Sequence, residues 1–229
     1  MNHFKKNHLL ENHSIVILIL RQFMLKPVRG FRNHRCPGCQ LPKHLCICSL
    51  LPYLNTKATF WVLMHPFEYG KPTNTGRIIQ DCIPQTKIIF WERTTPDFDL
   101  LSMIQDQQDV FLMFPEEYKT DHNSIAQSIQ LSVANPHFIL LDGTWKQARK
   151  IFRKSPYLHR LPMISIKSNQ KSIYMLRRPS QNHHLCTIEV AITLLDLNGE
   201  IEQSRQMNSY FKKFINRHMN HRTGEQVFN

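Results

Sequence analysis

Residues 138–149 constrain the fold more than any other stretch of the chain. Residues 138–141 are all apolar, which is typical of a strand buried on both faces of a sheet. Asp142, Gly143 and Thr144 follow at once, and the next residues have the pattern of a helix that Thr144 can cap. A strand that turns directly into a helix places polar groups at the carboxyl edge of a sheet, where open α/β sheets bind ligands. An ordinary capped turn needs the same residue types, so both interpretations are open at this point.

The rest of the chain alternates between apolar runs and helical patterns. Strands are expected at residues 58–64, 87–91, 110–114 and 161–166. Helices are expected at residues 78–82, 100–104, 121–134, 145–155, 185–195 and 201–219. This alternation predicts an α/β domain with a mostly parallel sheet and helices on both faces.

The charge balance favours a polyanionic partner. The chain has 29 Lys and Arg against 17 Asp and Glu, a formal net charge of +12. Such an excess suits nucleic acid first and an anionic membrane surface second, and a basic protein without either partner is the alternative. No stretch approaches the roughly 20 apolar residues of a membrane span, so we expect no membrane association and a cytoplasmic location. Residues 1–30 are interpreted as a polar N-terminal arm.

Four of the six cysteines cluster before the first strand: Cys36, Cys39, Cys46 and Cys48. The first pair forms a knuckle, and the second pair can close a tetrahedral site of four sulfurs. Four thiolates leave no catalytic position open, so the pattern favours structural zinc over an iron–sulfur cluster or no metal. Because the second pair is separated by one residue only, His34 or His44 stays open as a replacement ligand. We assign residues 31–54 to a small zinc-binding element.

Two loops are expected near the ligand edge. The loop after the first strand carries several hydrogen-bond donors that can hold a carboxylate or phosphate: Lys71, Thr73, Asn74, Thr75 and Arg77. A surface loop that caps a helix is the alternative interpretation. A long polar loop at residues 167–184 contains Arg177, a further candidate for binding an anion. Loops of this length in compact domains are usually functional or mobile.

Cations outside these loops are candidates for contact with the phosphates of RNA. They lie beside the cysteines and along the helix at 145–155. Together with Lys71, the expected RNA-binding residues are Arg32, Arg35, Lys146, Arg149, Lys150, Arg153 and Lys154. A solvated charged surface is the alternative for each group.

Several motifs together resemble the DTW-domain family. Asp142-Gly143-Thr144-Trp145 is similar to the Asp-x-Thr-Trp signature of that family, and the cysteine cluster precedes the first strand as it does there. The other matching motifs follow in the family's order at residues 71–77, 114–115, 149–158 and 186–189. The resemblance extends from about Cys36 to Leu195.

The resemblance implies a tRNA-uridine aminocarboxypropyltransferase of the bacterial type. Such enzymes transfer the 3-amino-3-carboxypropyl group of S-adenosylmethionine to N3 of a uridine, here expected in the tRNA variable loop, and release methylthioadenosine. The resemblance also implies a SPOUT-like, knotted fold, although the first thirty residues and the C-terminal helix match the family poorly or not at all. We assign residues 55–229 to the catalytic domain and expect tRNA, and no protein, as its partner. The alternatives are a methyltransferase of the same knotted class and a non-catalytic zinc-bearing RNA-binding protein.

The resemblance and the sheet-edge argument together define a candidate site. Asp142, Thr144 and Trp145 are the expected catalytic residues, and Asp142 either accepts the N3 proton or stabilises the donor electrostatically. Cofactor contacts are expected from Arg77, Phe114, Pro115, Leu141, Asp142, Gly143, Arg177, Thr187 and Glu189. Trp145 either stacks on a base or packs in the core, and Cys186 is expected to serve packing alone.

Overall fold

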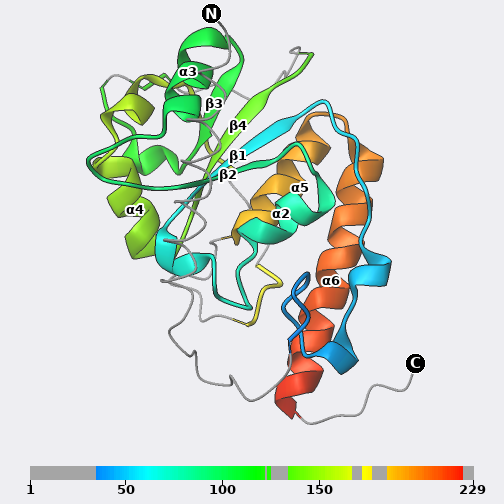
Figure 1. The fold of residues 1–229 in the computed structure, drawn as a ribbon. Helices are drawn as coiled ribbons and strands as arrows, with labels where there is room; N and C mark the ends of the chain where they lie inside the picture. Colours follow the sequence, from blue (N-terminus) through cyan, green and yellow to red (C-terminus); the bar gives the residue numbers. More distant parts are fainter. Residues whose placement is uncertain (1–34, 122, 125–133, 167–171, 177–184, 224–229) are drawn as a thin grey trace, which may run out of the picture.

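A central sheet with helices packed on both sides makes up most of the molecule (Figure 1). The computed structural model describes residues 35–121, 123–124, 134–166, 172–176 and 185–223. The N-terminal arm at residues 1–30 and most of the helix expected at 121–134 lie outside this part of the chain. Arg32, His34 and Arg177 lie outside it as well.

The sheet has five strands, and all of them run parallel. They are β1 (Thr59–Met64), β2 (Lys87–Phe90), β3 (Val110–Met113), β4 (His137–Asp142) and β5 (Met163–Ile164). Their order across the sheet is β2-β1-β4-β3-β5. All five lie within or beside the expected apolar runs, so the predicted parallel sheet is confirmed. Because β4 is the central strand, its last residue, Asp142, lies in the middle of the carboxyl edge of the sheet.

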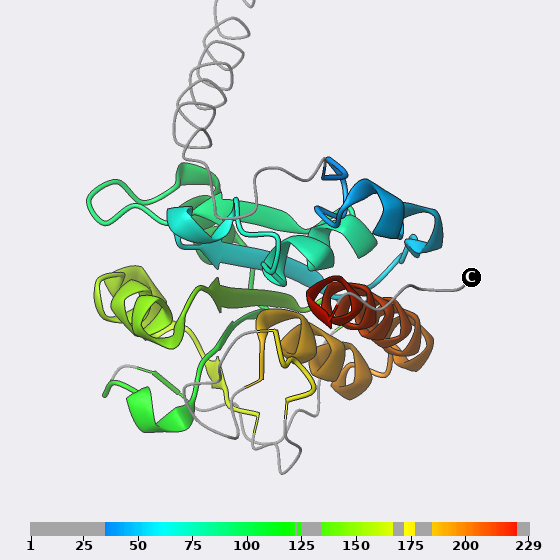
Figure 2. The same ribbon diagram turned by 90° about the horizontal axis from the view of Figure 1, so that it is seen from below.

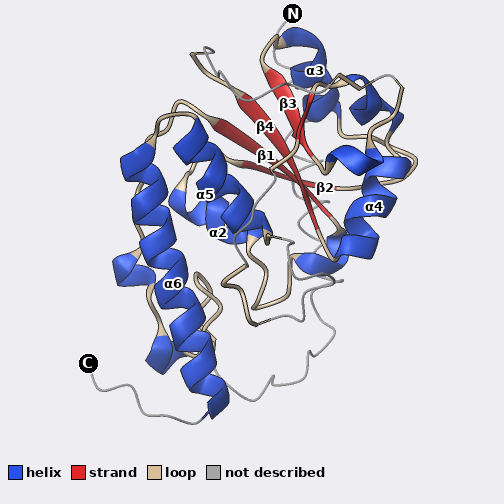
Figure 3. Cartoon of the chain, turned by 180° about the vertical axis from the view of Figure 1, so that it is seen from behind, coloured by secondary structure: helices blue, strands red, loops and turns tan. Residues whose placement is uncertain are grey.

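The helices cover both faces of this sheet, as Figures 2 and 3 show. They are α2 (Gly76–Cys82), α3 (Phe98–Asp106), α4 (Trp145–Arg153), α5 (Thr187–Leu197) and α6 (Ile201–Thr223). One core cluster joins α2, α5 and α6 to Phe138 and Leu140, and a second joins α3 and α4 to Ile139. Since successive strand residues face opposite sides, β4 is buried on both faces as its apolar run predicted.

The connections out of β1 and β4 leave the sheet on opposite faces. These strands are neighbours, with Met64 beside Asp142. The chain leaves β1 for α2 on one face of the sheet and leaves β4 for α4 on the other. Open parallel sheets bind ligands where neighbouring connections diverge in this way. The sheet order, which the sequence did not give, therefore places Asp142 at such a point.

The described part of the zinc-binding element, residues 35–54, is called the cysteine segment, and it packs on the face of the sheet that carries α2 and α6 (Figure 2). Leu41, Leu45 and Ile47 belong to the same core cluster as these helices. The backbone N–H of Leu54 also donates to the carbonyl of Cys82 at 2.8 Å, at the end of α2. The segment is therefore built into the main core.

The expected knot stays a prediction, because parts of the segment between β5 and α5, residues 167–171 and 177–184, are outside the described residues. Among the helices that the structure describes, none combines the length and the apolar composition that a membrane crossing requires.

Candidate active site

A cavity of about 380 Å³ lies at the carboxyl edge of β3, β4 and β5. The ends of these strands, the first turn of α4 and the start of α5 line it, together with Ser172 and Tyr174. Its apolar walls include Met113, Leu140 and Val190. The volume falls in the range of about 300–1,000 Å³ that is typical of small-molecule sites. The cavity therefore suits a ligand with an apolar body and a few polar groups.

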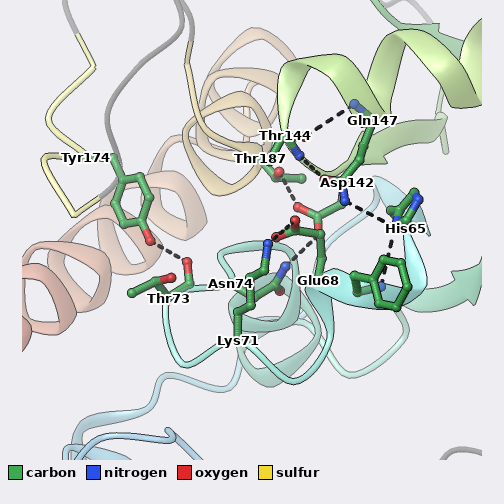
Figure 4. A network of polar contacts seen from close by, with 11 residues as sticks. His65, Glu68, Lys71, Thr73, Asn74, Asp142, Thr144, Gln147, Tyr174 and Thr187 are labelled. Atoms are coloured by element: carbon green, nitrogen blue, oxygen red, sulfur yellow. Dashed lines mark hydrogen bonds and ion pairs between the residues drawn. The ribbon is translucent and has the colours of Figure 1, made fainter. Parts of the chain in front are cut away.

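Asp142 lies at the wall of this cavity with only 3% of its surface exposed. Its Oδ2 accepts a hydrogen bond from Asn74 Nδ2 at 2.6 Å, and its Oδ1 accepts one from Thr187 Oγ1 at 2.5 Å. Figure 4 shows these donors reaching the carboxylate from the loop before α2 and from the start of α5. A buried carboxylate requires such partners. Here they also fix its orientation relative to the cavity.

The first turn of α2 sets the position of Asn74 and approaches Asp142 closely. The backbone N–H of Arg77 donates to Asn74 Oδ1 at 2.8 Å, so the amide must present its Nδ2 donor to the carboxylate. A Cβ at Gly76 would stand 2.8 Å from Asp142 Cγ. Glycine therefore permits the contact between α2 and the acid.

Thr144 and Gln147 form a capping box at the start of α4. Thr144 Oγ1 accepts from the Gln147 N–H at 3.3 Å, and Gln147 Oε1 accepts from the Thr144 N–H at 2.6 Å. This confirms that Thr144 caps the helix. Gln147 Nε2 also lies 3.2 Å from His65 Nδ1, which accepts from the Phe67 N–H as well. Burial, and secondarily the charge of Lys150, lowers the pKa of His65, which favours a neutral ring with its proton on Nε2.

Glu189 supports one wall of the cavity from behind. Its carboxylate accepts from Ser172 Oγ at 2.6 Å, from the Ile173 N–H at 2.8 Å and from the Cys186 N–H at 2.8 Å. The hydroxyl of Tyr174 donates to the carbonyl of Thr73. Glu189 thus holds the segment at 172–174 against the start of α5. It contacts residues that line the cavity, Ser172 and Cys186, but does not line the cavity itself. Burial raises the pKa of the Cys186 thiol, which keeps it protonated and suits a packing role.

Trp145 is half-buried and both packs and lines the cavity. Its ring stacks on Phe114 with centroids 5.5 Å apart and meets Tyr118 edge-on at 5.4 Å. Phe114 also lines the cavity. The two roles that the sequence left open for Trp145, packing and ligand contact, are therefore compatible.

The structure brings together most of the residues expected to bind the cofactor or catalyse. Of the expected residues, those that line the cavity are Phe114, Pro115, Leu141, Asp142, Gly143, Thr144, Trp145 and Thr187. Arg77 and Lys71 lie elsewhere: Arg77 Nη2 donates to the Cys39 carbonyl at 3.2 Å, and Lys71 Nζ pairs with Glu68 at 2.6 Å. Sequence reasoning missed Ser172 and Tyr174, because their long polar loop has no periodic pattern that singles out a residue.

The outer face of α4 is strongly cationic. Ala148, Ile151 and Phe152 are buried on its inner side, and Ala148 reaches the cavity. The expected RNA-binding residues of this helix and its end are all exposed: Lys146, Arg149, Lys150, Arg153 and Lys154. One helix therefore joins the wall of the cavity to a surface suited to phosphate contact. Arg35 lies in the cysteine segment, where its Nη1 donates to the Gln40 carbonyl at 2.9 Å.

The four clustered thiols converge as a metal site requires. The sulfurs of Cys36, Cys39, Cys46 and Cys48 all lie within 4.8 Å of one another, and three of the separations are 3.4, 3.5 and 3.8 Å. Zinc–sulfur bonds of about 2.3 Å in a tetrahedron give sulfur separations of about 3.8 Å. Burial opposes ionisation of Cys36, but hydrogen bonds from the Cys39 N–H and from neighbouring thiols lower its pKa to about 7. The geometry fits a four-cysteine metal site.

Comparisons with known proteins agree with these features. A model of the DTW domain matches residues 33–219. The proteins named tRNA-uridine aminocarboxypropyltransferase 2 from Macaca fascicularis and Mus musculus are 27% and 28% identical to the chain, and the alignments cover 76% of it and 60% of each relative. The protein of the same name from Drosophila melanogaster is 26% identical to the chain, and the alignment covers 76% of the chain and 71% of that relative. The chain thus spans about 60% of the length of the first two relatives. No solved structure matches.

Proposed function

Because the chain belongs to the DTW-domain family, we propose that it is an S-adenosylmethionine-dependent tRNA-uridine aminocarboxypropyltransferase. It transfers the 3-amino-3-carboxypropyl group to N3 of a uridine, in the variable loop of tRNA, and releases methylthioadenosine. The names of the relatives support the reaction class and the RNA. A cytoplasmic location, in which clustered cysteines bind metal more often than they form disulfides, belongs to the same proposal.

The observation that carries this proposal is the position of Asp142. Its carboxylate stands at the wall of a ligand-sized cavity, held by Asn74 and Thr187. S-adenosylmethionine carries an adenosyl group that suits apolar and aromatic walls, and a sulfonium and an ammonium that suit a nearby carboxylate. Met113, Phe114 and Val190 supply the apolar and aromatic walls, and Asp142 supplies the carboxylate.

The reaction requires one bond to form and one to break. Uridine N3 bonds to the propyl carbon next to the sulfonium, the carbon–sulfur bond breaks, and its electron pair leaves with the sulfur of methylthioadenosine. The N3 proton must pass to a base. Each oxygen of Asp142 accepts a hydrogen bond, which holds the carboxylate still, and a carboxylate oxygen has more than one lone pair. Asp142 therefore either accepts the N3 proton or binds the positively charged donor, and the Asp142→Asn variant below tests whether its charge is needed.

Positioning decides which carbon is transferred. The propyl carbon, and not the methyl carbon, must face the nucleophile at attack distance. The segment at 172–174, held by Glu189, and the aromatic pair of Phe114 and Trp145 both line the cavity and would confine the donor there. The cations of α4 would bring the phosphates of tRNA to the same edge.

The cysteine segment has a structural role in this proposal. Zinc bound by Cys36, Cys39, Cys46 and Cys48 would tie together a segment that is buried against α2 and α6. Four thiolate ligands supply structural stabilisation and leave no position for a substrate.

An isotope experiment tests the reaction class. The full chain is incubated with tRNA and S-adenosylmethionine labelled either at the carboxyl carbon or at the methyl carbon. We expect only the carboxyl label to enter the tRNA, and nucleoside mass spectrometry then locates the uridine. Methyl label in its place would identify a methyltransferase. Binding of tRNA without saturable donor binding would identify a non-catalytic RNA-binding protein.

A matched pair of variants tests the role of Asp142 in this assay. Asp142→Asn keeps the size of the side chain and removes its charge, and Asp99→Asn makes the same change at an exposed position on α3. We expect transfer to be lost in the first variant and kept in the second, with tRNA binding unchanged in both. Normal turnover by Asp142→Asn would remove this carboxylate from the mechanism.

A further inference from the structure

Helix α2 is fastened at both ends to the cysteine segment. In its first turn, Arg77 Nη2 donates to the carbonyl of Cys39 at 3.2 Å. At its last residue, the Cys82 carbonyl accepts from the Leu54 N–H at 2.8 Å. Cys39 is buried and belongs to the same core cluster as Ile78 and its neighbours on α2. A displacement of the cysteine segment would therefore displace α2 as well.

The same first turn also fixes the acid of the candidate active site. The backbone N–H of Arg77 holds Asn74, and Asn74 donates to Asp142 at 2.6 Å. Gly76 lies so close to the carboxylate of Asp142 that a Cβ at this position would stand 2.8 Å from Asp142 Cγ. No further heavy atom fits between α2 and the carboxylate. A shift of α2 along this direction must displace Asp142, because close-packed interiors transmit such strain.

We propose that Arg77 is a positioning residue that couples the cysteine segment to Asp142. Its guanidinium holds the carbonyl of a metal-ligand residue, Cys39, and its backbone N–H orients the amide that holds the acid. Metal bound by the four thiols fixes Cys39, and through Arg77 it fixes α2 and the wall of the cavity. The cavity's ligand is taken here as S-adenosylmethionine, so this part of the inference rests on the proposed function.

The side chain of Arg77 is suited to this task and not to contact with the donor. It is buried, and its Nε lies 3.8 Å from Asp81 Oδ2, one turn further along α2. Its guanidinium thus lies between its own helix and the cysteine segment. This role differs from the carboxylate contact that the sequence suggested.

The test compares three forms of the full chain, each stripped of metal by a chelator and then reloaded with Zn²⁺. They are the unaltered protein, Arg77→Gln, and Arg205→Gln as a control. Arg205 also pairs with a carboxylate on its own helix, Glu202 at 2.8 Å, but it is exposed and has no link to the cysteine segment. The two substitutions therefore remove the same charge and the same kind of ion pair.

Two quantities are measured: the amide hydrogen exchange of residues 76–83 and the Kd of S-adenosylmethionine. We expect zinc to slow the exchange of α2 and to tighten donor binding about tenfold in the unaltered protein, which is a usual size for coupling between sites. Arg205→Gln should behave in the same way. In Arg77→Gln, the effect of zinc on both quantities should be much smaller, because the link at the first turn of α2 is cut and only the Leu54–Cys82 hydrogen bond and the shared core remain.

The outcomes separate this inference from the proposed function. An equal response to zinc in Arg77→Gln and in the unaltered protein would overturn the role of Arg77, and so would α2 exchange that ignores zinc in the unaltered protein. If the zinc-loaded protein binds no S-adenosylmethionine, the proposed function fails, while the exchange data still decide the coupling. If Arg77→Gln does not fold, Arg77→Lys, which keeps the charge and loses the planar guanidinium, takes its place and should respond to zinc less than the unaltered protein does.

Discussion

Replacing Gly76 by alanine tests whether the contact between α2 and Asp142 matters for activity. The new methyl carbon would stand 2.8 Å from Asp142 Cγ and 2.9 Å from its Oδ1. Carbon atoms in contact are normally about 3.5–4.0 Å apart, so the helix or the carboxylate must move by about 0.7 Å or more. Asn74 and Thr187 hold the carboxylate, so the displacement must also disturb these hydrogen bonds.

The free energy of unfolding and the rate should respond very differently to this change. Overpacking of this kind costs about 1–3 kcal/mol, and the better helix propensity of alanine returns up to about 1 kcal/mol. We therefore expect a net loss of stability of about 0–2 kcal/mol. Misplacing a reacting group by about 1 Å costs on the order of 100-fold in rate. The variant should stay folded and lose between one and two orders of magnitude in kcat/KM.

The assay is transfer of carboxyl-labelled donor to tRNA, with urea unfolding measured in parallel. Gly70→Ala is the matched control, because it adds the same methyl group in the preceding loop, where no atom lies within 4 Å. It should keep both its activity and its stability. If Gly76→Ala keeps more than half of the activity, the close approach of α2 has no catalytic importance and the reasoning about Asp142 fails.

Four further outcomes follow from the site and its surroundings. Thr187→Val removes one donor to Asp142 at nearly constant shape, so transfer should fall about tenfold, whereas Thr193→Val on the same helix should not change it. Arg149→Gln should weaken tRNA binding and reduce its dependence on log salt by about one, with donor affinity unchanged. The pKa of His65 is lowered below 6.5 in the folded protein, so its contribution to stability is complete above that pH and is lost as the pH falls. Urea unfolding between pH 7 and 5 should therefore show a shallower decline in His65→Gln. Cys46→Ser should lower both the bound zinc and the melting temperature, and a full zinc complement with unchanged melting would contradict a four-cysteine site.

The sheet and its ligand edge could be predicted from the sequence because their causes are local. An apolar run of four to six residues gives a buried strand, and alternation with helices makes the sheet parallel. The carboxyl ends of parallel strands meet at one edge, so the sequence alone predicts that Asp142, Phe114 and Thr144 lie near one another. Met113, the last residue of β3, also lines the cavity, although no motif in the sequence singles it out.

The hydrogen-bond partners could not be predicted, because they depend on contacts between distant parts of the chain. Thr187 and Asp142 are 45 residues apart, and Asn74 and Asp142 are 68 apart. The sequence marks the loop before α2 as rich in donors, but several of its side chains are chemically able to bind a carboxylate. Only the packing of α2 against β4 selects Asn74 from among them.

Arg77 shows which single fact would have corrected the sequence interpretation. Consecutive residues of a helix point about 100° apart around its axis, so two neighbours cannot share one face. Gly76 is the residue of α2 that meets Asp142. Arg77 projects from a different side of α2, and its guanidinium reaches the carbonyl of Cys39 in the cysteine segment. An arginine beside a ligand-edge loop indicates anion binding only when the register of its helix is known, and here the register directs the guanidinium to Cys39.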